Sequence, residues 1–264
     1  MLDLVFIDVD GTLVGSSREV SPAVWAGIDR ARERGLRLAL CSGRPAFGAT
    51  QEFAKRLGPR GWHVFQNGAS IVHAGTGESR SARMPRAALD MLIERSRRLG
   101  RSLELYADDE YAVEPDSDRA RRHAELLKIE YAPRPFESLR EPVVRAQWLL
   151  AQGEDGAVLA EPHAGLTLSP SLAPAMPDTI FVNITPAGVD KGSAVRAVAE
   201  AYDVRLDRVM YVGDGRNDAV AMREVGVPVA MANAEDEAIA AASHVVRDVD
   251  DDGLLDALEI ALRG

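Results

Sequence analysis

The chain has 264 residues, of which 46% are hydrophobic and 27% charged, as is typical of a globular protein with one large domain or two modest ones. Its net charge of −10 argues against a nucleic-acid-binding surface, which needs a basic patch. The negative charge does not exclude a phosphorylated substrate, because a bound divalent cation reverses the local field of an acidic site. The single cysteine, Cys41, excludes an internal disulfide bond and is predicted to be a small buried side chain.

The first residues contain a short apolar run, which Asp3 and Asp8 interrupt and which no basic segment precedes. We therefore predict no signal peptide, and no stretch is long and apolar enough to span a bilayer. The expectation is a cytoplasmic protein, monomeric or homodimeric, that binds neither membrane nor nucleic acid.

Strands and helices alternate in the first third of the chain. A continuous apolar run predicts a buried strand, and Ser21, Pro22 and Gly35 mark the N-cap, first turn and end of the helix that follows. Strand, helix, strand, helix, strand is the order of a doubly wound parallel sheet. The predicted elements are a strand at 4–9, a helix at 21–35, a strand at 36–41, a helix near 47–57, and a third strand with a turn at Asn67-Gly68 within 62–72.

The middle of the chain loses this alternation and predicts a mixed α+β unit. A Pro- and Arg-rich stretch at 132–142 is expected to be a connecting loop within it. The predicted elements are a helix at 87–99, strands at 102–107 and 111–115, a helix at 118–129, a strand at 143–151, a short helix, and strands at 165–170 and 178–185.

The alternation returns after Thr185, so one domain is interrupted by another. The predicted elements are a helix at 190–203, a strand at 208–214, a helix at 216–226, a strand and loop at 228–234, a helix at 235–243 and a last helix from about Asp252. The fold class is therefore α/β, with a doubly wound parallel, Rossmann-like core at 1–81 and 187–264 and an inserted α+β domain at 82–186.

Four polar clusters follow strands of the predicted core, at 8–12, 42–44, Lys191 and 213–218. In an open α/β sheet, ligands bind outside the carboxyl ends of the strands. Acidic strand ends that converge there would repel one another unless a cation lay between them. The ligand set contains only oxygen, which favours Mg²⁺ over zinc.

The same clusters contain groups that suit a phosphate. Gly11 allows a close backbone approach, and the amides after Asp10 are expected to form an anion-binding concavity. Ser42 offers a hydroxyl group, and Lys191 offers a positive charge at the start of a helix, where the helix dipole also favours an anion.

Together these clusters resemble the haloacid dehalogenase-like phosphohydrolases, and within them the Cof-type group. The resemblance covers the whole chain, and the insert lies where that family has its type-2 cap. A single DxDGT is moderately specific, whereas four motifs in order are much more so. The matching motifs are DVDGTL at 8–13, SGR at 42–44, NGA at 67–69, DKG at 190–192, and GDGRNDAVAM at 213–222, followed by VGVPVAMANA.

The resemblance implies that Asp8 is a nucleophile that forms an aspartyl-phosphate, and that Asp10 is first a general acid and then a general base. It implies Mg²⁺ as cofactor, held by Asp8, Asp10 through its backbone carbonyl, Asp214 and, through water, Asp218. A small phosphorylated metabolite such as a sugar phosphate would be hydrolysed, and the cap would select it. The residues implied to bind phosphate or substrate are Gly11, Thr12, Ser42, Gly43, Arg44, Asn67, Lys191 and Asn217.

Other interpretations stay open from the sequence. Asp8 and Asp10 could be strand-end carboxylates that cap a turn, and Arg44 could simply pair with an acidic residue. A receiver-type signalling domain also accepts phosphate on an aspartate, although it lacks a cap and the second carboxylate. A dinucleotide-binding protein, a catalytically inactive binding module, a phosphomannomutase and the dedicated sugar-phosphate phosphatases are further alternatives.

The remaining expectations concern the insert and the histidines. Trp148 and Gln147 lie on an inserted strand and either face the site or pack in the core. The connectors at 80–84 and 185–189 are predicted to be hinges. The five histidines match no metal-ligand spacing, and most are expected to be exposed.

Overall fold

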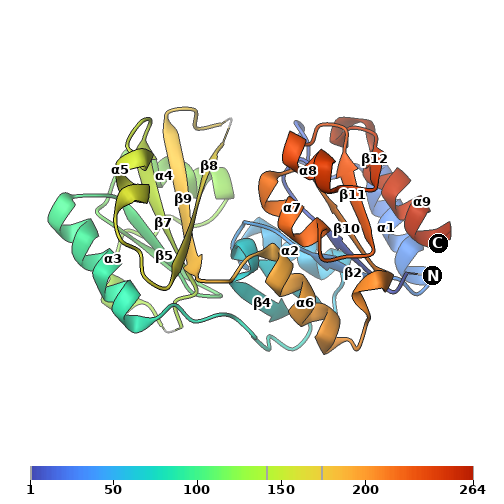
Figure 1. Ribbon diagram of the computed structural model, residues 1–264, viewed down its shortest axis with the longest axis horizontal. Coiled ribbons are helices and arrows are strands. Elements are labelled where there is room, and N and C mark those ends of the chain that lie inside the picture. The colour runs from blue at the N-terminus through green and yellow to red at the C-terminus, as the bar shows by residue number, and fades with distance from the viewer. Residues whose placement is uncertain (1, 141, 174, 264) are drawn as a thin grey trace. The chain divides into compact units, whose positions relative to one another are not determined.

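The computed structural model describes residues 2–140, 142–173 and 175–263, which form two compact units (Figure 1). Unit 1 contains the residues up to Gly43, Glu52–Ser79 and the residues from Asp190 onward. Unit 2 contains Arg44–Gln51 and Arg80–Val189. From the sequence, the boundaries are predicted near residues 82 and 186. The sequence does not predict that the short segment Arg44–Gln51 belongs to the inserted unit.

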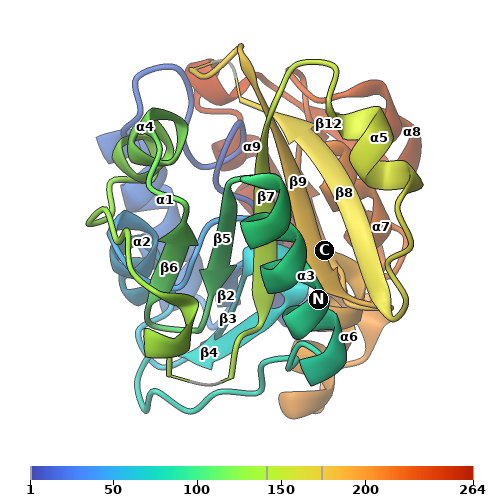
Figure 2. The ribbon, with the colours of Figure 1, turned by 90° about the vertical axis from the view of Figure 1, so that its left-hand side faces the viewer.

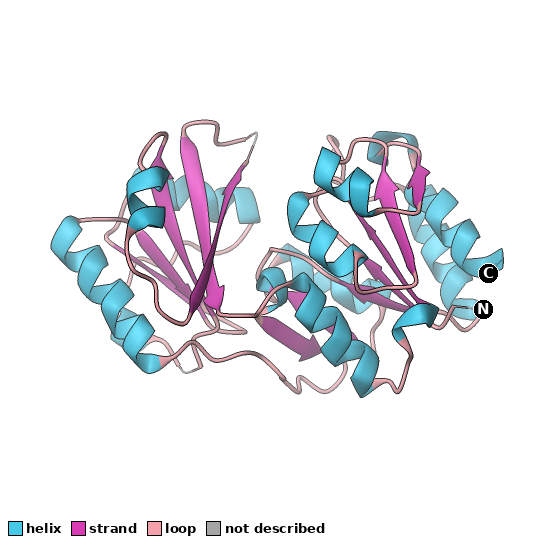
Figure 3. Cartoon of the chain, viewed as in Figure 1, coloured by secondary structure: helices cyan, strands magenta, loops and turns pink. Residues whose placement is uncertain are grey.

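Figure 3 distinguishes the helices, the strands and the loops that connect them by colour. The first three residues of α2 belong to unit 2. Along the chain the elements are β1 (Leu4–Ile7), α1 (Pro22–Glu33), β2 (Arg37–Leu40), α2 (Ala49–Leu57), β3 (Trp62–Phe65), η1 (Gln66–Gly68), β4 (Ser70–His73), α6 (Lys191–Ala201), η3 (Leu206–Arg208), β10 (Val209–Gly213), α7 (Arg216–Met222), β11 (Val227–Met231), α8 (Asp236–Ala241), β12 (His244–Val246), η4 (Val249–Asp251) and α9 (Leu254–Arg263).

Unit 1 is built on a parallel sheet with the strand order β12-β11-β10-β1-β2. Its strands are short and almost wholly apolar, as expected when both faces of a parallel sheet are covered. Residues of α6, α7 and α8 pack on the face that carries Phe6 and Tyr211. On α1, Gly27 lies against Leu255 and Leu258 of α9, so these two helices pack together. The doubly wound α/β core predicted from the sequence is confirmed.

The third predicted strand of the core does not join this sheet as a full parallel neighbour. β3 is joined to the chain after β2 by a single parallel bridge between Cys41 and Val64, and its main partner is β4, which runs antiparallel to it. Gln66, Asn67 and Gly68 all have positive φ angles, and this turn reverses the chain. A Cβ atom on Gly68 would overlap the backbone of Asp190, so the glycine lets the turn approach the start of α6.

Unit 2 contains an antiparallel sheet with the order β6-β5-β7-β9-β8, shown in Figure 2. One face of the sheet is apolar and packs against α3, with Leu92 and Trp148 in this core. The elements are α3 (Arg86–Leu99), β5 (Leu103–Tyr106), β6 (Tyr111–Glu114), α4 (Asp118–Leu127), η2 (Phe136–Ser138), β7 (Arg145–Ala151), α5 (Asp155–Ala160), β8 (Leu166–Leu172) and β9 (Thr179–Pro186). The inserted α+β domain that the sequence predicts is therefore present, and the predicted loop at 132–142 includes the short turn η2.

The other face of this sheet carries a buried polar group that we call the Glu104 network: Glu104, Tyr106, His123 and Gln147. The Glu104 carboxylate accepts hydrogen bonds from the Tyr106 hydroxyl at 2.7 Å, His123 Nδ1 at 2.9 Å and Gln147 Nε2 at 3.2 Å. Successive strand residues point to opposite faces, so Trp148 packs in the apolar core and Gln147 joins this network.

The expectation that most histidines are exposed is wrong, because only His244 is exposed. His63 is fully buried: its Nδ1 accepts a hydrogen bond from the Leu40 amide at 3.0 Å, and its Nε2 donates to the Gly58 carbonyl at 2.8 Å. Burial lowers the pKa of His63 from 6.5 to about 4. Among the described residues, no helix combines the length and apolar character that crossing a bilayer requires.

Candidate active site

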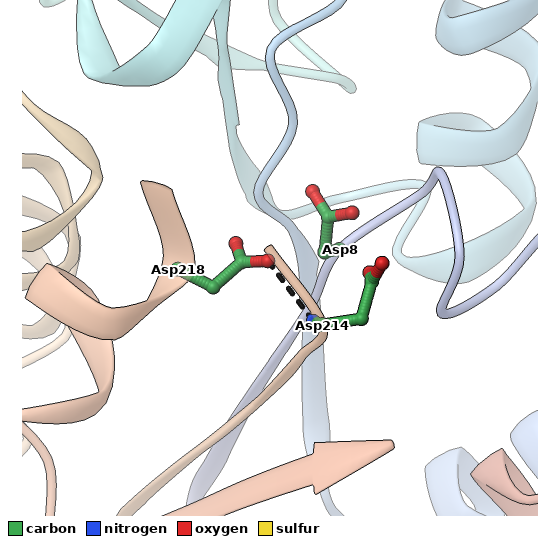
Figure 4. A group of neighbouring side chains, drawn as sticks. All are labelled: Asp8, Asp214 and Asp218. Carbon is green, nitrogen blue, oxygen red and sulfur yellow. Dashed lines mark hydrogen bonds between the residues drawn. The ribbon is translucent and has the colours of Figure 1, made fainter. Parts of the chain in front are cut away.

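Three carboxylates meet at the carboxyl ends of two neighbouring parallel strands. Asp8 follows β1, Asp214 follows β10, and Asp218 lies in the first turn of α7. One oxygen atom from each lies within 4.8 Å of the others (Figure 4). Asp8 and Asp218 are buried and Asp214 is half-buried. We call these three residues the carboxylate cluster.

A buried ammonium group joins two members of the cluster. Lys191 is the first residue of α6, and its Nζ lies 2.6 Å from both Asp8 Oδ1 and Asp218 Oδ1. Its side chain is 1% exposed. Burial alone would lower the pKa of Lys191, but the carboxylates of Asp218 and Asp8 outweigh this effect and raise it. Lys191 is therefore charged and holds the two carboxylates together.

Asp218 is fixed more firmly than its two neighbours. Besides Lys191, its Oδ1 accepts a hydrogen bond from the Tyr211 hydroxyl at 2.6 Å. Its Oδ2 accepts from the amides of Asp214 and Gly215 at 3.1 and 2.8 Å. No motif in the sequence marks Tyr211 as part of the site. Its only signal in the sequence is a hydroxyl-bearing side chain inside the apolar strand that leads to the GDGRND motif.

The carboxylate cluster contains more negative charge than Lys191 neutralises. The pKa of Asp8 is raised well above its ordinary value, first by burial and then by the Asp218 carboxylate, and Lys191 only partly opposes this. Burial and Asp218 likewise raise the pKa of Asp214 to about 7. A divalent cation bound by oxygen atoms would relieve both effects, so the donor set fits Mg²⁺.

The loop after Asp8 folds back on itself. The carbonyl of Val9 accepts hydrogen bonds from the amides of Thr12, Leu13 and Val14, and the Gly11 amide donates to the Val14 carbonyl. These four amides are therefore used within the loop. The anion-binding concavity predicted for the amides after Asp10 is not formed by them, because the tight turn orients them toward these carbonyls.

Gly11 and Thr12 both contact Asp214. Gly11 has a φ of +81°, and a Cβ atom there would overlap the Asp214 carboxylate, so only glycine fits. The Thr12 hydroxyl donates to Asp214 Oδ1 at 2.8 Å. Asp10 is exposed, and its carboxylate is close enough to contribute to the raised pKa of Asp8 and of Asp214. It is not one of the three residues of the carboxylate cluster.

A second group of predicted residues gathers beside α7. Ser42 is buried, and its backbone carbonyl accepts a hydrogen bond from the Asn67 amide at 3.1 Å. Asn67 Oδ1 accepts from Asn217 Nδ2 at 3.0 Å, and a Cβ atom on Gly43 would lie 3.1 Å from that same Oδ1. Asn217 directly precedes Asp218, so this group adjoins the carboxylate cluster. Arg44 belongs to unit 2.

Comparison with known proteins identifies the class to which this fold and site belong. Residues 5–258 match the haloacid dehalogenase-like hydrolase family. A solved haloacid dehalogenase-like hydrolase from Bacteroides thetaiotaomicron is similar over 98% of this chain and 99% of its own, with a TM-score of 0.85 and 26% identity. This chain belongs to the haloacid dehalogenase-like hydrolases.

Two similar relatives carry names that state a substrate. The phosphoglycolate phosphatase of Haloarcula marismortui is 30% identical over 257 residues, 96% of this chain and 95% of the relative. The 5-amino-6-(5-phospho-D-ribitylamino)uracil phosphatase YwtE of Bacillus subtilis is 24% identical over 288 residues, 98% of each chain. Both are similar along their whole length, and their named substrates differ.

Proposed function

We propose that this chain is a Mg²⁺-dependent phosphatase, which hydrolyses a small phosphorylated metabolite through an aspartyl-phosphate (acyl phosphate) on Asp8. The observation that carries the proposal is the position of Asp8, a buried carboxylate at a strand end with Lys191 and two further carboxylates beside it. Family membership and the phosphatase names of the relatives support the same reaction class.

Asp8 and Asp10 differ in surroundings, and this difference suits two roles. The carboxylate of Asp8 lies in the cluster and is held there by Lys191, as a positioned nucleophile requires. An oxygen of Asp8 would form a bond to phosphorus while the bond from phosphorus to the leaving oxygen breaks. Asp10, which is exposed and two residues away, would give its proton to that leaving oxygen.

The second half of the reaction uses Asp10 in reverse. As a carboxylate it would take a proton from water, whose oxygen attacks phosphorus and releases Asp8 and inorganic phosphate. Asp8, Asp214, Asp218 and the Asp10 carbonyl would hold Mg²⁺, which supplies positive charge beside the phosphoryl group when it is bound. Lys191, Ser42 and Asn217 would bind the phosphoryl oxygens, and Gly43, Arg44 and Asn67 would be further phosphate- or substrate-binding residues. Gly11 and Thr12, for which the sequence predicts the same role, would act through Asp214, which both contact.

The substrate class is inferred from the relatives. Phosphoglycolate and a phosphorylated ribityl compound are both small monoesters of an alcohol, and the second carries a sugar alcohol. We propose a sugar phosphate or a similar metabolite, with unit 2 as the part that selects it.

The test measures phosphate release from an aryl phosphate and a panel of sugar phosphates, with Mg²⁺, with EDTA, and with the variant Asp8→Asn. We expect turnover that needs Mg²⁺ and disappears in Asp8→Asn, and the panel would rank the leaving groups. If no compound releases phosphate while a small phosphodonor still labels Asp8, the chain is a phosphoryl acceptor or a mutase and the proposal is wrong.

A further inference from the structure

Asn233 lies just after β11, and its side chain connects two loops of unit 1. Its Nδ2 donates a hydrogen bond to the Gly11 carbonyl at 2.8 Å, and its Oδ1 accepts one from the Val249 amide at 3.0 Å. A carbonyl can only accept and an amide can only donate, so these two partners determine which atom of the side chain is nitrogen. The mechanism proposed above gives Asn233 no role.

The Gly11 end of this connection lies in the loop that carries Asp8 and Asp10. Gly11 packs so closely on the Asp214 carboxylate that no side chain fits between them. The orientation of the Gly11 peptide group therefore sets how near the loop lies to Asp214. The hydrogen bond from Asn233 fixes that orientation from outside the carboxylate cluster.

The turn that contains Asn233 also holds the backbone of Asp214. The Glu235 amide donates to the Asp214 carbonyl at 2.8 Å, and the Ala234 amide closes the turn on Met231. One short turn thus bonds to the Asp8 loop through Asn233 and to the Asp214 strand end through Glu235. These are the two sides of the carboxylate cluster.

The hydrogen bond from the Val249 amide to Asn233 connects this turn to a third segment, which also contacts the Asp8 loop. Val249 begins η4, and Asp250 in the same turn accepts a hydrogen bond from the Ser16 amide at 2.8 Å. A Cβ atom on Gly15 would overlap the Asp250 carboxylate, so the chain passes close there as well. The far end of the Asp8 loop is thereby tied to the turn that Asn233 holds.

We propose that Asn233 is a positioning residue, which sets the spacing between the Asp8 loop and Asp214 without contacting the reacting atoms. Its effect on kcat rests on the proposed phosphatase reaction, whereas its effect on metal binding rests only on the carboxylate cluster binding Mg²⁺. An asparagine suits the position because one side chain must donate to Gly11 and accept from Val249. An ionised aspartate would keep the second bond and lose the first.

The test compares Asn233→Ala and Asn233→Asp with the native chain. Mg²⁺ affinity is measured by calorimetry without substrate, kcat and KM by phosphate release, and the melting temperature in EDTA. We expect Asn233→Ala to weaken Mg²⁺ binding and to lower kcat, each about tenfold, with KM for substrate nearly unchanged. Because Asn233 is exposed, the melting temperature should fall by only about 2–3 °C.

Ser243→Ala is the matched control, since this exposed hydroxyl donates to the Pro228 carbonyl at 3.1 Å near the other end of β11. It should change none of these values. Asn233→Asp should resemble Asn233→Ala, because both lose the donor to Gly11. Native Mg²⁺ affinity in either variant overturns the proposal, whatever happens to the melting temperature. If the native chain releases no phosphate, the proposed function fails while the calorimetric comparison still decides this inference.

Discussion

Each unit buries a cluster of ionisable side chains, and the two clusters differ in the donors that surround their carboxylates. In the Glu104 network of unit 2, one carboxylate accepts hydrogen bonds from three donors, His123, Tyr106 and Gln147. In unit 1, Asp8 and Asp218 share the single ammonium of Lys191, and Asp214 adds a third carboxylate. The Glu104 carboxylate is surrounded by three donors, whereas the carboxylate cluster has one ammonium group for three carboxylates.

This difference separates a structural role from a functional one. A buried polar network whose donors and acceptors are all matched stabilises the fold it belongs to. A cluster with uncompensated charge costs stability, and the raised pKa values of Asp8 and Asp214 express that cost. Such a cluster is expected where a ligand supplies the missing charge. Changes in unit 1 should therefore affect activity and metal binding, and changes in the Glu104 network should affect stability.

The largest effect is expected from Asp8→Asn, which removes the proposed nucleophile and one of the repelling charges. Activity should fall by more than about a thousandfold. The melting temperature in EDTA should not fall, because the change relieves the repulsion that raises the pKa of Asp8. Steady-state phosphate release and thermal unfolding measure the two quantities. A variant that keeps a tenth of native activity would contradict the assignment.

Lys191→Met should lower the stability of the chain, whereas Asp8→Asn should not. It leaves Asp8 and Asp218 buried without their shared ammonium, so we expect the free energy of unfolding to fall by about 3–5 kcal/mol, together with loss of activity. Lys55→Met is the control, since Lys55 pairs with Glu52 on the surface and should change stability by less than about 1 kcal/mol. Denaturant unfolding of both variants provides the measurement. Equal effects in the two would show that the cluster is not under strain.

His63 tests a buried ionisable group of unit 1 that lies outside the carboxylate cluster. Its pKa is 6.5 when unfolded and about 4 when folded, so between these values the unfolded chain binds more protons. The contribution of His63 to the free energy of unfolding should fall by about 3 kcal/mol as the pH drops from about 6.5 to about 4. The raised pKa values of Asp8 and Asp214 act in the opposite direction, so the difference between the native chain and His63→Gln isolates the His63 contribution. Denaturant unfolding at several pH values checks this. His63→Gln should lose that part of the slope, and the exposed His244→Gln should keep it.

Glu104→Gln should give the smallest effect. In contrast to Asp8→Asn, it should lower stability and leave activity nearly unchanged. It replaces an acceptor of three hydrogen bonds with a group that also donates, so we expect the free energy of unfolding to fall by about 1–3 kcal/mol. Hydrolysis of a small aryl phosphate should stay within about twofold of native. Glu52→Gln on the surface is the control. A large loss of turnover by a still-folded Glu104→Gln would remove the distinction between the two groups.

The sequence predicts the centre of the site well because topology brings its parts together. Asp8 and Asp214 end strands that are neighbours in a parallel sheet, and Lys191 and Asp218 begin helices at the same edge. The fold class and the family follow from the same motifs. The catalytic and binding roles stay predictions that the experiments above test.

Other features depend on contacts that a local pattern does not reveal. Tyr211 and Asn233 act through partners on other elements, and their own segments are an ordinary strand and an ordinary turn. His63 is hydrogen-bonded to Leu40 of β2 and to Gly58, both of which precede β3 in the chain. β3 pairs with β4 because three successive positive φ angles reverse the chain. The direction of the loop amides after Asp10 follows from a single tight turn, which a motif does not specify.

The position of β1 in the core sheet has a consequence for how the chain folds during synthesis. β1 lies between β2 and β10, and it pairs Leu4 with Arg37 on one side and with Val209 on the other. All of unit 2 is made before β10, so for that time the sheet has only two strands and β1 has an unpaired edge. Two strands alone are marginally stable, and an open apolar edge invites aggregation. Ribosome-bound chains that stop before Asp190 should therefore need protection by chaperones, and Asp8 gains its surroundings only at the last stage of folding.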